Sequence, residues 1–188
     1  YDQTKFEEKL EIKGDNDHTK LIAMLNALND YSVPMSDILG KYFDTENLAY
    51  WMAFQLLTGN IDTQSRNMYL YSPTNSDTFY LLDWDNDGML MRKEYEIKQR
   101  SDGKSWENGI SNYWGNMLFS RCLQTKSFRT ALDKAIQDEY KYMNANRINS
   151  MVKHYRSITE QYVWKMPDSM YEGVTKSQYD VIANQLHS

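Results

Sequence analysis

The sequence has 188 residues, of which 41% are hydrophobic and 25% charged, proportions typical of a folded domain rather than a disordered chain. Its 21 Lys and Arg are outnumbered by 26 Asp and Glu, so it lacks the basic excess of a typical nucleic-acid-binding protein and we expect no nucleic-acid partner. Its single cysteine cannot form an internal disulfide, and no apolar run approaches the roughly 18 to 20 residues of a membrane-spanning helix.

Helical spacing dominates the first third of the chain. Residues 1–16 are predicted to be a leading segment, and residues 17–60 are predicted to be helical. From His18 onward, apolar residues recur at helical intervals, at Leu21, Ile22, Leu25 and Leu28. Pro34 is suited to starting a second helix, which we expect to reach Tyr42.

A third helix follows at once. Asp44 is a suitable N-cap residue, and Gly59 is a suitable terminator. The residues between them are apolar around much of the helix circumference, at positions that include Leu48, Trp51, Met52 and Leu56. We therefore predict that this is the central buried helix.

The periodicity changes in the middle of the chain. Residues 67–71 and 78–82 are aromatic, strand-like runs separated by a turn-forming stretch at 72–77, which predicts a β-hairpin. Its tyrosines and the neighbouring Trp84 could form a platform for a sugar or a base, but packing of aromatic strands on helices explains them equally well. We assign them to packing.

The second half returns to helical spacing. The predicted helices are residues 113–123, 128–143, 148–163 and 175–186. We therefore predict a single domain over residues 1–188, of mainly α (α+β) class, in which residues 61–97 supply loops and the hairpin and residues 98–188 form a helical bundle.

Oxygen-bearing side chains gather around the predicted hairpin: Asp62, Asn67, Asp83, Asp85 and Asp87. Antiparallel pairing brings Asn67 and the three later aspartates to the open end of the hairpin. If the second strand continues, alternation places Asp83 and Asp85 on one face. Carboxylates gathered in this way repel one another without a cation, and hard oxygen ligands suit Mg²⁺, Mn²⁺ or Ca²⁺. A divalent metal site is predicted.

An Asp, an Asn five residues later, a hairpin and another Asp occur in this order in the protein-kinase catalytic centre. The surrounding sequence resembles the CotH kinase family of spore coat protein H-like atypical protein kinases over about residues 17–163. The matching motifs are Tyr42-Phe43-Asp44, Gly59-Asn60-Ile61-Asp62, Asn67-Met68-Tyr69-Leu70-Tyr71, Leu82-Asp83-Trp84-Asp85-Asn86-Asp87, Met117-Leu118-Phe119-Ser120-Arg121-Cys122-Leu123 and Phe128-Arg129.

The resemblance implies a protein-kinase-like C-terminal lobe and a role for each site residue. Asp62 would be the catalytic aspartate, and Asn67 and Asp85 would bind nucleotide and metal, with Asp87 and Asp83 as further metal ligands. The implied cofactor is Mg²⁺ or Mn²⁺ with ATP. The implied partner is a protein with Ser or Thr hydroxyls, by analogy secreted, on a bacterial surface or in a spore coat.

The sequence departs from the kinase pattern in two places. Arg66 stands where the family usually has His, and Asn60-Ile61 stands where ordinary kinases have His-Arg. Neither a Gly-rich phosphate loop nor a strand lysine is recognisable before Asp62. Because the chain also starts at Tyr1 rather than Met, we expect a missing N-terminal lobe in a longer parent protein and an inactive isolated fragment.

Three alternatives remain open. Residues 83–94 match the EF-hand calcium-loop pattern, with Asp83 first and Glu94 twelfth, which would make Ca²⁺ the ligand. The chain could instead be a catalytically silent, adhesin-like surface module that keeps a kinase scaffold. Finally, Asp62, Asn67 and Asp85 could be only cap and turn residues, which Asx side chains favour.

Overall fold

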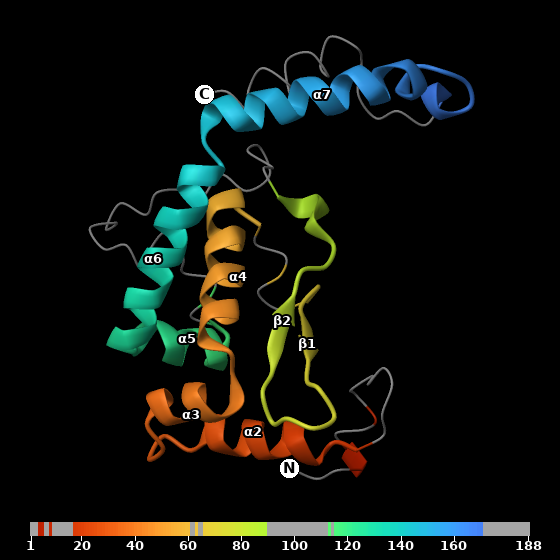
Figure 1. Ribbon diagram of the computed structural model, residues 1–188. Coiled ribbons are helices and arrows are strands. Elements are labelled where there is room, and N and C mark those ends of the chain that lie inside the picture. The colour runs from red at the N-terminus through yellow and green to blue at the C-terminus, as the bar shows by residue number, and fades with distance from the viewer. Residues whose placement is uncertain are drawn as a thin grey trace. The chain divides into compact units, whose positions relative to one another are not determined.

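The computed structural model in Figure 1 describes residues 4–5, 8, 17–60, 63, 66–89, 113 and 115–170. These residues are mainly helical and include one two-stranded antiparallel hairpin, as predicted. The chain divides into two compact units, Tyr1–Ile136 and Gln137–Ser188.

The first unit contains helices α2 (Thr19–Asn29), α3 (Met35–Tyr42), α4 (Thr45–Thr58), α5 (Met117–Gln124) and the start of α6 (Lys126–Tyr142). The first three confirm the predicted helices. The helix predicted from Tyr113 was placed four residues too early. Asn116 caps α5, because its side-chain oxygen accepts a hydrogen bond from Leu118 N at 3.0 Å.

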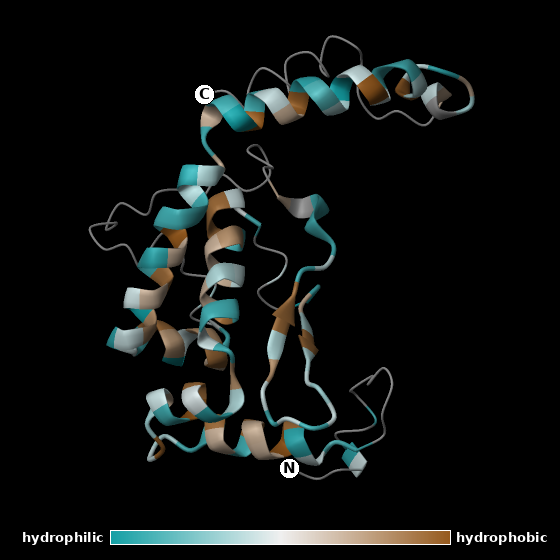
Figure 2. Ribbon diagram, in the orientation of Figure 1, coloured by the Kyte–Doolittle hydropathy of each residue, from teal (hydrophilic) through white to brown (hydrophobic). Residues whose placement is uncertain are grey.

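Helix α4 has the two ends that the sequence indicates. The Asp44 carboxylate accepts a hydrogen bond from Asn47 N at 2.9 Å, and Gly59 has a φ of 65°, a left-handed conformation that glycine adopts without strain. Seven side chains of the helix are buried: Leu48, Ala49, Trp51, Met52, Ala53, Gln55 and Thr58. Figure 2 shows apolar residues along its length. The prediction of a buried central helix is confirmed.

Aromatic and apolar side chains fill the core between α4 and the later helices. Trp51 stacks on Phe119 of α5 with ring centroids 5.5 Å apart, and Tyr113 meets the same ring edge-on at 5.2 Å. On the side facing α6, the Lys134 ammonium donates to the Tyr50 hydroxyl at 3.2 Å. Buried Phe128 and Leu132 of α6 join this core.

A buried arginine joins α5 to the C-terminal end of α2. The Arg121 guanidinium donates to the carbonyl oxygens of Leu28 at 2.5 Å and Val33 at 2.6 Å, and lies 5.0 Å from the centre of the Tyr31 ring. Carbonyl groups at a helix C-terminus carry partial negative charge, which compensates a buried cation. This one side chain therefore fixes where α5 meets α2.

The hairpin consists of β1 (Tyr69–Tyr71) and β2 (Tyr80–Leu82), with Tyr69 opposite Leu82 and Tyr71 opposite Tyr80. Both strands are shorter than the sequence predicted. The backbone of Phe79 pairs with the α3–α4 junction instead of with β1: its N–H donates to Tyr42 O at 2.7 Å, and its carbonyl accepts from Asp44 N at 3.3 Å.

Polar side chains attach the hairpin to the helices. The Lys20 ammonium on α2 donates to Pro73 O at 2.5 Å and Ser76 O at 2.6 Å in the turn. The Asn47 amide on α4 donates to Leu81 O at 3.2 Å and accepts from Leu81 N at 2.8 Å. The hairpin is therefore fixed at its turn and along its second strand, and Figure 1 shows β2 running alongside α4.

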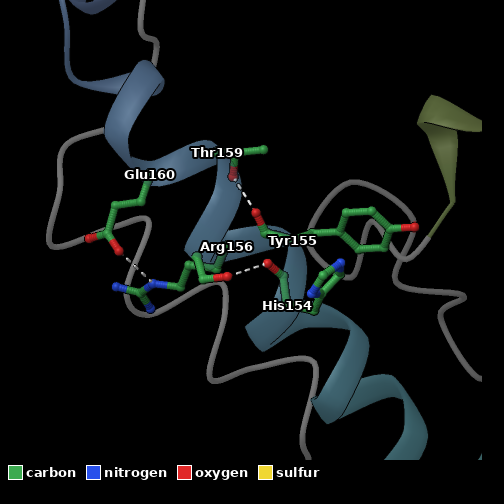
Figure 3. Close-up of polar contacts among 6 residues, drawn as sticks. His154, Tyr155, Arg156, Thr159 and Glu160 are labelled. Carbon is green, nitrogen blue, oxygen red and sulfur yellow. Dashed lines mark hydrogen bonds and ion pairs between the residues drawn. The ribbon is translucent and has the colours of Figure 1, made fainter.

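The second unit contains α7 (Ala145–Val163) and the short helix η4 (Asp168–Met170). No residue of α7 is buried. Two of its polar contacts lie within the helix: the Thr159 hydroxyl donates to Tyr155 O at 2.9 Å, and Arg156 pairs with Glu160 at 3.4 Å (Figure 3). The predicted helix at 175–186 lies outside the described residues, so the bundle over 98–188 stays a prediction.

None of the helices in the described ranges combines the length and apolar character needed to cross a membrane.

Candidate functional site

Most of the predicted site residues lie at the open end of the hairpin. Because Tyr69 and Leu82 form the last pair of the ladder, Asn67 on one side and Asp83 to Asp87 on the other leave the hairpin at the same end. This is the juxtaposition that the sequence predicted. Asp62 lies outside the described residues.

Two site residues have a left-handed backbone. Asn67 and Asp85 each have a φ of 54°, and in the described part of the chain no other residue except glycine has a positive φ. Asn and Asp tolerate this conformation better than most residues, and such backbone outliers concentrate at functional sites. The two candidate ligands with the strongest motif support are therefore the two residues with this backbone feature.

The left-handed turn corrects one expectation. Strand β2 ends at Leu82, and after Asp85 the chain enters the short helix η2 (Asn86–Gly88). Strand alternation therefore does not extend to Asp85, and it cannot place Asp83 and Asp85 on one face. Any convergence of their carboxylates depends on the turn rather than on a continued strand.

The Asp83 carboxylate is directed toward α4. Its Oδ1 accepts a hydrogen bond from Gln55 Nε2 at 2.9 Å, and the Gln55 side chain is 1% exposed. Partial burial raises the pKa of Asp83, whereas the hydrogen bond from Gln55 acts in the opposite direction. The other amide atom, Gln55 Oε1, is buried without a hydrogen-bond partner.

A second amide holds the loop on the other side of Asp85. Buried Asn60 donates from Nδ2 to Asn86 Oδ1 at 3.2 Å. Neither the Gln55 contact nor the Asn60 contact was predicted from the sequence. The available signal was that Gln55 is a polar residue inside an otherwise apolar helix, and that Asn60 directly follows the Gly59 terminator.

Aromatic side chains cover the outer face of the hairpin. Tyr69 is 42% exposed and Trp84 is 56% exposed, and their rings meet edge-on with centroids 5.1 Å apart. Tyr71 is also exposed, whereas Leu81, which points to the other face, is buried. The assignment of these aromatics to packing on helices is wrong for Tyr69, Tyr71 and Trp84, because they lie on the face that points away from the core.

The EF-hand alternative and the single cysteine can be compared with the structure. The residues that lead into Asp83 form strand β2, whereas an EF-hand loop follows a helix; Glu94 lies outside the described residues. Cys122 is fully buried, and burial raises the pKa of its thiol, which fits a core residue rather than a nucleophile.

The chemistry of the donors fits a magnesium ion that also binds phosphate. Asn67 offers an amide oxygen, and Asp85 and Asp87 offer carboxylates. Mg²⁺ in nucleotide sites uses one or two carboxylates together with phosphate oxygens and water. Within the described ranges, no three His, Cys, Asp or Glu side chains come close enough to hold a metal on their own.

The family model described as CotH kinase protein matches residues 1–188, the whole chain. The chain therefore belongs to the CotH kinase family, which confirms the resemblance found in its motifs. Membership supports a kinase-like function in general and suggests ATP and proteins as its classes of partner. No curated protein and no solved structure gave a match in the other two comparisons.

Proposed function

We propose that this chain is the C-terminal lobe of a CotH-like atypical protein kinase that transfers the γ-phosphoryl group of ATP to a Ser or Thr hydroxyl of a secreted or coat protein. The observation that carries the proposal is that Asn67 and Asp85 flank the open end of the hairpin and that both have a φ of 54°. The order of elements supports it, because a buried helix, a loop and a hairpin precede the second Asp, as in protein kinases.

Each site residue has a distinct role in this proposal. The Asp62 carboxylate orients the accepting hydroxyl and takes its proton. Asn67 and Asp85 hold Mg²⁺ or Mn²⁺, with Asp87 as a further ligand. With a metal bound, these residues would hold positive charge against the phosphates. The hydroxyl oxygen bonds to the γ-phosphorus, and the bond to the β–γ bridging oxygen breaks, so that ADP leaves with that electron pair.

The exposed aromatic pair provides a place for the base of the nucleotide. Tyr69 lies two residues after Asn67, and Trp84 directly precedes Asp85, so the aromatic face begins where the metal ligands are. Stacking of a base on an aromatic side chain contributes about 1–3 kcal/mol. In this proposal the base covers the Tyr69–Trp84 face while the phosphates reach the open end of the hairpin.

The test is phosphate transfer from γ-labelled ATP in the complete natural protein that contains these residues. We expect Asp62→Ala and Asp85→Ala each to lower incorporation by at least about 100-fold, because the first removes the group that orients and deprotonates the hydroxyl and the second removes a carboxylate that would hold the metal. Asp77→Ala is the matched control, since Asp77 is exposed in the turn at the opposite end of the hairpin. Unchanged incorporation in Asp62→Ala or Asp85→Ala would contradict the proposal.

A further inference from the structure

Amide side chains from α4 and from Asn60, just after its C-terminal cap, are bonded to β2 and the loop that follows it. Asn47 pairs with the backbone of Leu81, Gln55 donates to Asp83, and Asn60 donates to Asn86. From Asn47 to Asn60, each later residue bonds to a later position within residues 81–86. The last two contacts lie on either side of Asp85, two residues before it and one residue after it.

Gln55 has no packing reason to be polar. It is 1% exposed, and its neighbours on α4 include the fully buried Met52 and Ala53. Burying an amide costs free energy unless both its donor and its acceptor are used, and Gln55 Oε1 has no hydrogen-bond partner. A leucine of similar size would avoid this cost. Within the described part of the chain, its side chain makes a single hydrogen bond, the one to Asp83.

We propose that Gln55 and Asn60 are positioning residues that hold residues 83–86 on α4, so that Asp85 keeps its left-handed conformation at the open end of the hairpin. In this account Asp83 is the tether for Gln55 rather than a metal ligand. The ligand of Asp85 rests on the proposed function, whereas the attachment of residues 83–86 to α4 does not.

Two substitutions at Asp83 distinguish a tether for Gln55 from a metal ligand. Asp83→Asn removes the charge but keeps an oxygen that can accept from Gln55 Nε2, and its new N–H group can donate to the unpartnered Gln55 Oε1. Asp83→Ala removes the acceptor altogether, and Gln55→Leu removes the donor. A metal ligand would be damaged by both changes at Asp83, whereas a tether would be damaged only by the change to Ala.

The experiment measures backbone ¹⁵N order parameters of residues 83–89 in the metal-free chain. We expect Gln55→Leu and Asp83→Ala to lower them from about 0.85 toward 0.6, the range of a flexible backbone, while Asp83→Asn keeps the wild-type values. Gln161→Leu on exposed α7 is the matched control. Thermal melting checks folding, and Gln55→Leu should not lower the melting temperature because it removes a buried carbonyl without a partner.

The second readout is Mn²⁺ affinity by titration of the free-ion electron paramagnetic resonance signal. Gln55→Leu and Asp83→Ala should weaken binding about tenfold, as changes behind a metal ligand commonly do, while Asp83→Asn should bind as the wild type does. Unchanged order parameters in Gln55→Leu, or loss of Mn²⁺ affinity in Asp83→Asn as large as in Asp83→Ala, would overturn the inference. If Asp85→Ala bound Mn²⁺ as tightly as the wild type, the proposed metal site would be contradicted. The order parameters would still test whether Gln55 and Asn60 hold residues 83–86 on α4.

Discussion

Helices α4 and α7 begin in the same way and end up in opposite environments. Each starts with an Asx cap, in which Asp44 accepts from Asn47 N at 2.9 Å and Asn144 accepts from Arg147 N at 3.1 Å. Seven residues of α4 are buried, whereas α7 has none. Local capping therefore decides where both helices begin, and tertiary packing decides most of what each contributes to stability.

The two helices also differ in the environment of their glutamine side chains. Gln161 on α7 is exposed and donates to Ile158 O at 3.3 Å within its own helix. Gln55 on α4 is buried, and it reaches a carboxylate 28 residues away in sequence. A polar group that the fold keeps in its core has to be explained by its partner, and the partner here lies in the candidate site.

The largest effect is expected from Leu48→Ala on α4. Leu48 is completely buried in the main core cluster, so the change removes apolar contacts and leaves a cavity that costs about 2–5 kcal/mol of unfolding free energy. Denaturant unfolding followed by tryptophan fluorescence measures the loss, because Trp51 lies in the same core. A loss below about 1 kcal/mol would show that the α4 core is not packed as described.

The smallest effect is expected from the corresponding change on α7, Ile158→Ala. Ile158 is exposed, and surface substitutions usually change stability by no more than about 0.5 kcal/mol. The same unfolding measurement applies, with circular dichroism to follow helix content. If this variant lost as much stability as Leu48→Ala, α7 would be buried against a partner in solution and the contrast between the helices would fail.

Features set by neighbouring residues could be predicted from the sequence. Pro34 at the start of α3, Asp44 before α4 and Gly59 after it act within one turn of helix, and all three predictions are confirmed. The hairpin was predicted for the same reason, because its turn and its alternating strands are local patterns.

Features set by distant residues could not be predicted. Phe79 ends the β1–β2 pairing because its backbone bonds to Tyr42 and Asp44, which no local pattern indicates. The Gln55–Asp83 hydrogen bond likewise joins residues 28 apart in sequence, and no local pattern indicates that they meet. The exposure of Tyr69 depended on which face of the hairpin α4 covers, and aromatic content alone does not determine that.

The central claim is that the open end of the hairpin binds a metal–nucleotide complex. Adding Mn²⁺ with ATP to the ¹⁵N-labelled chain tests it directly, because the paramagnetic ion broadens only nearby amide signals, even when binding is weak. The account predicts selective broadening at Asn67 and at Asp83 to Asp87, lost in Asp85→Ala and retained in Asp77→Ala. Broadening that is absent from these residues, or that persists there in Asp85→Ala, would contradict it.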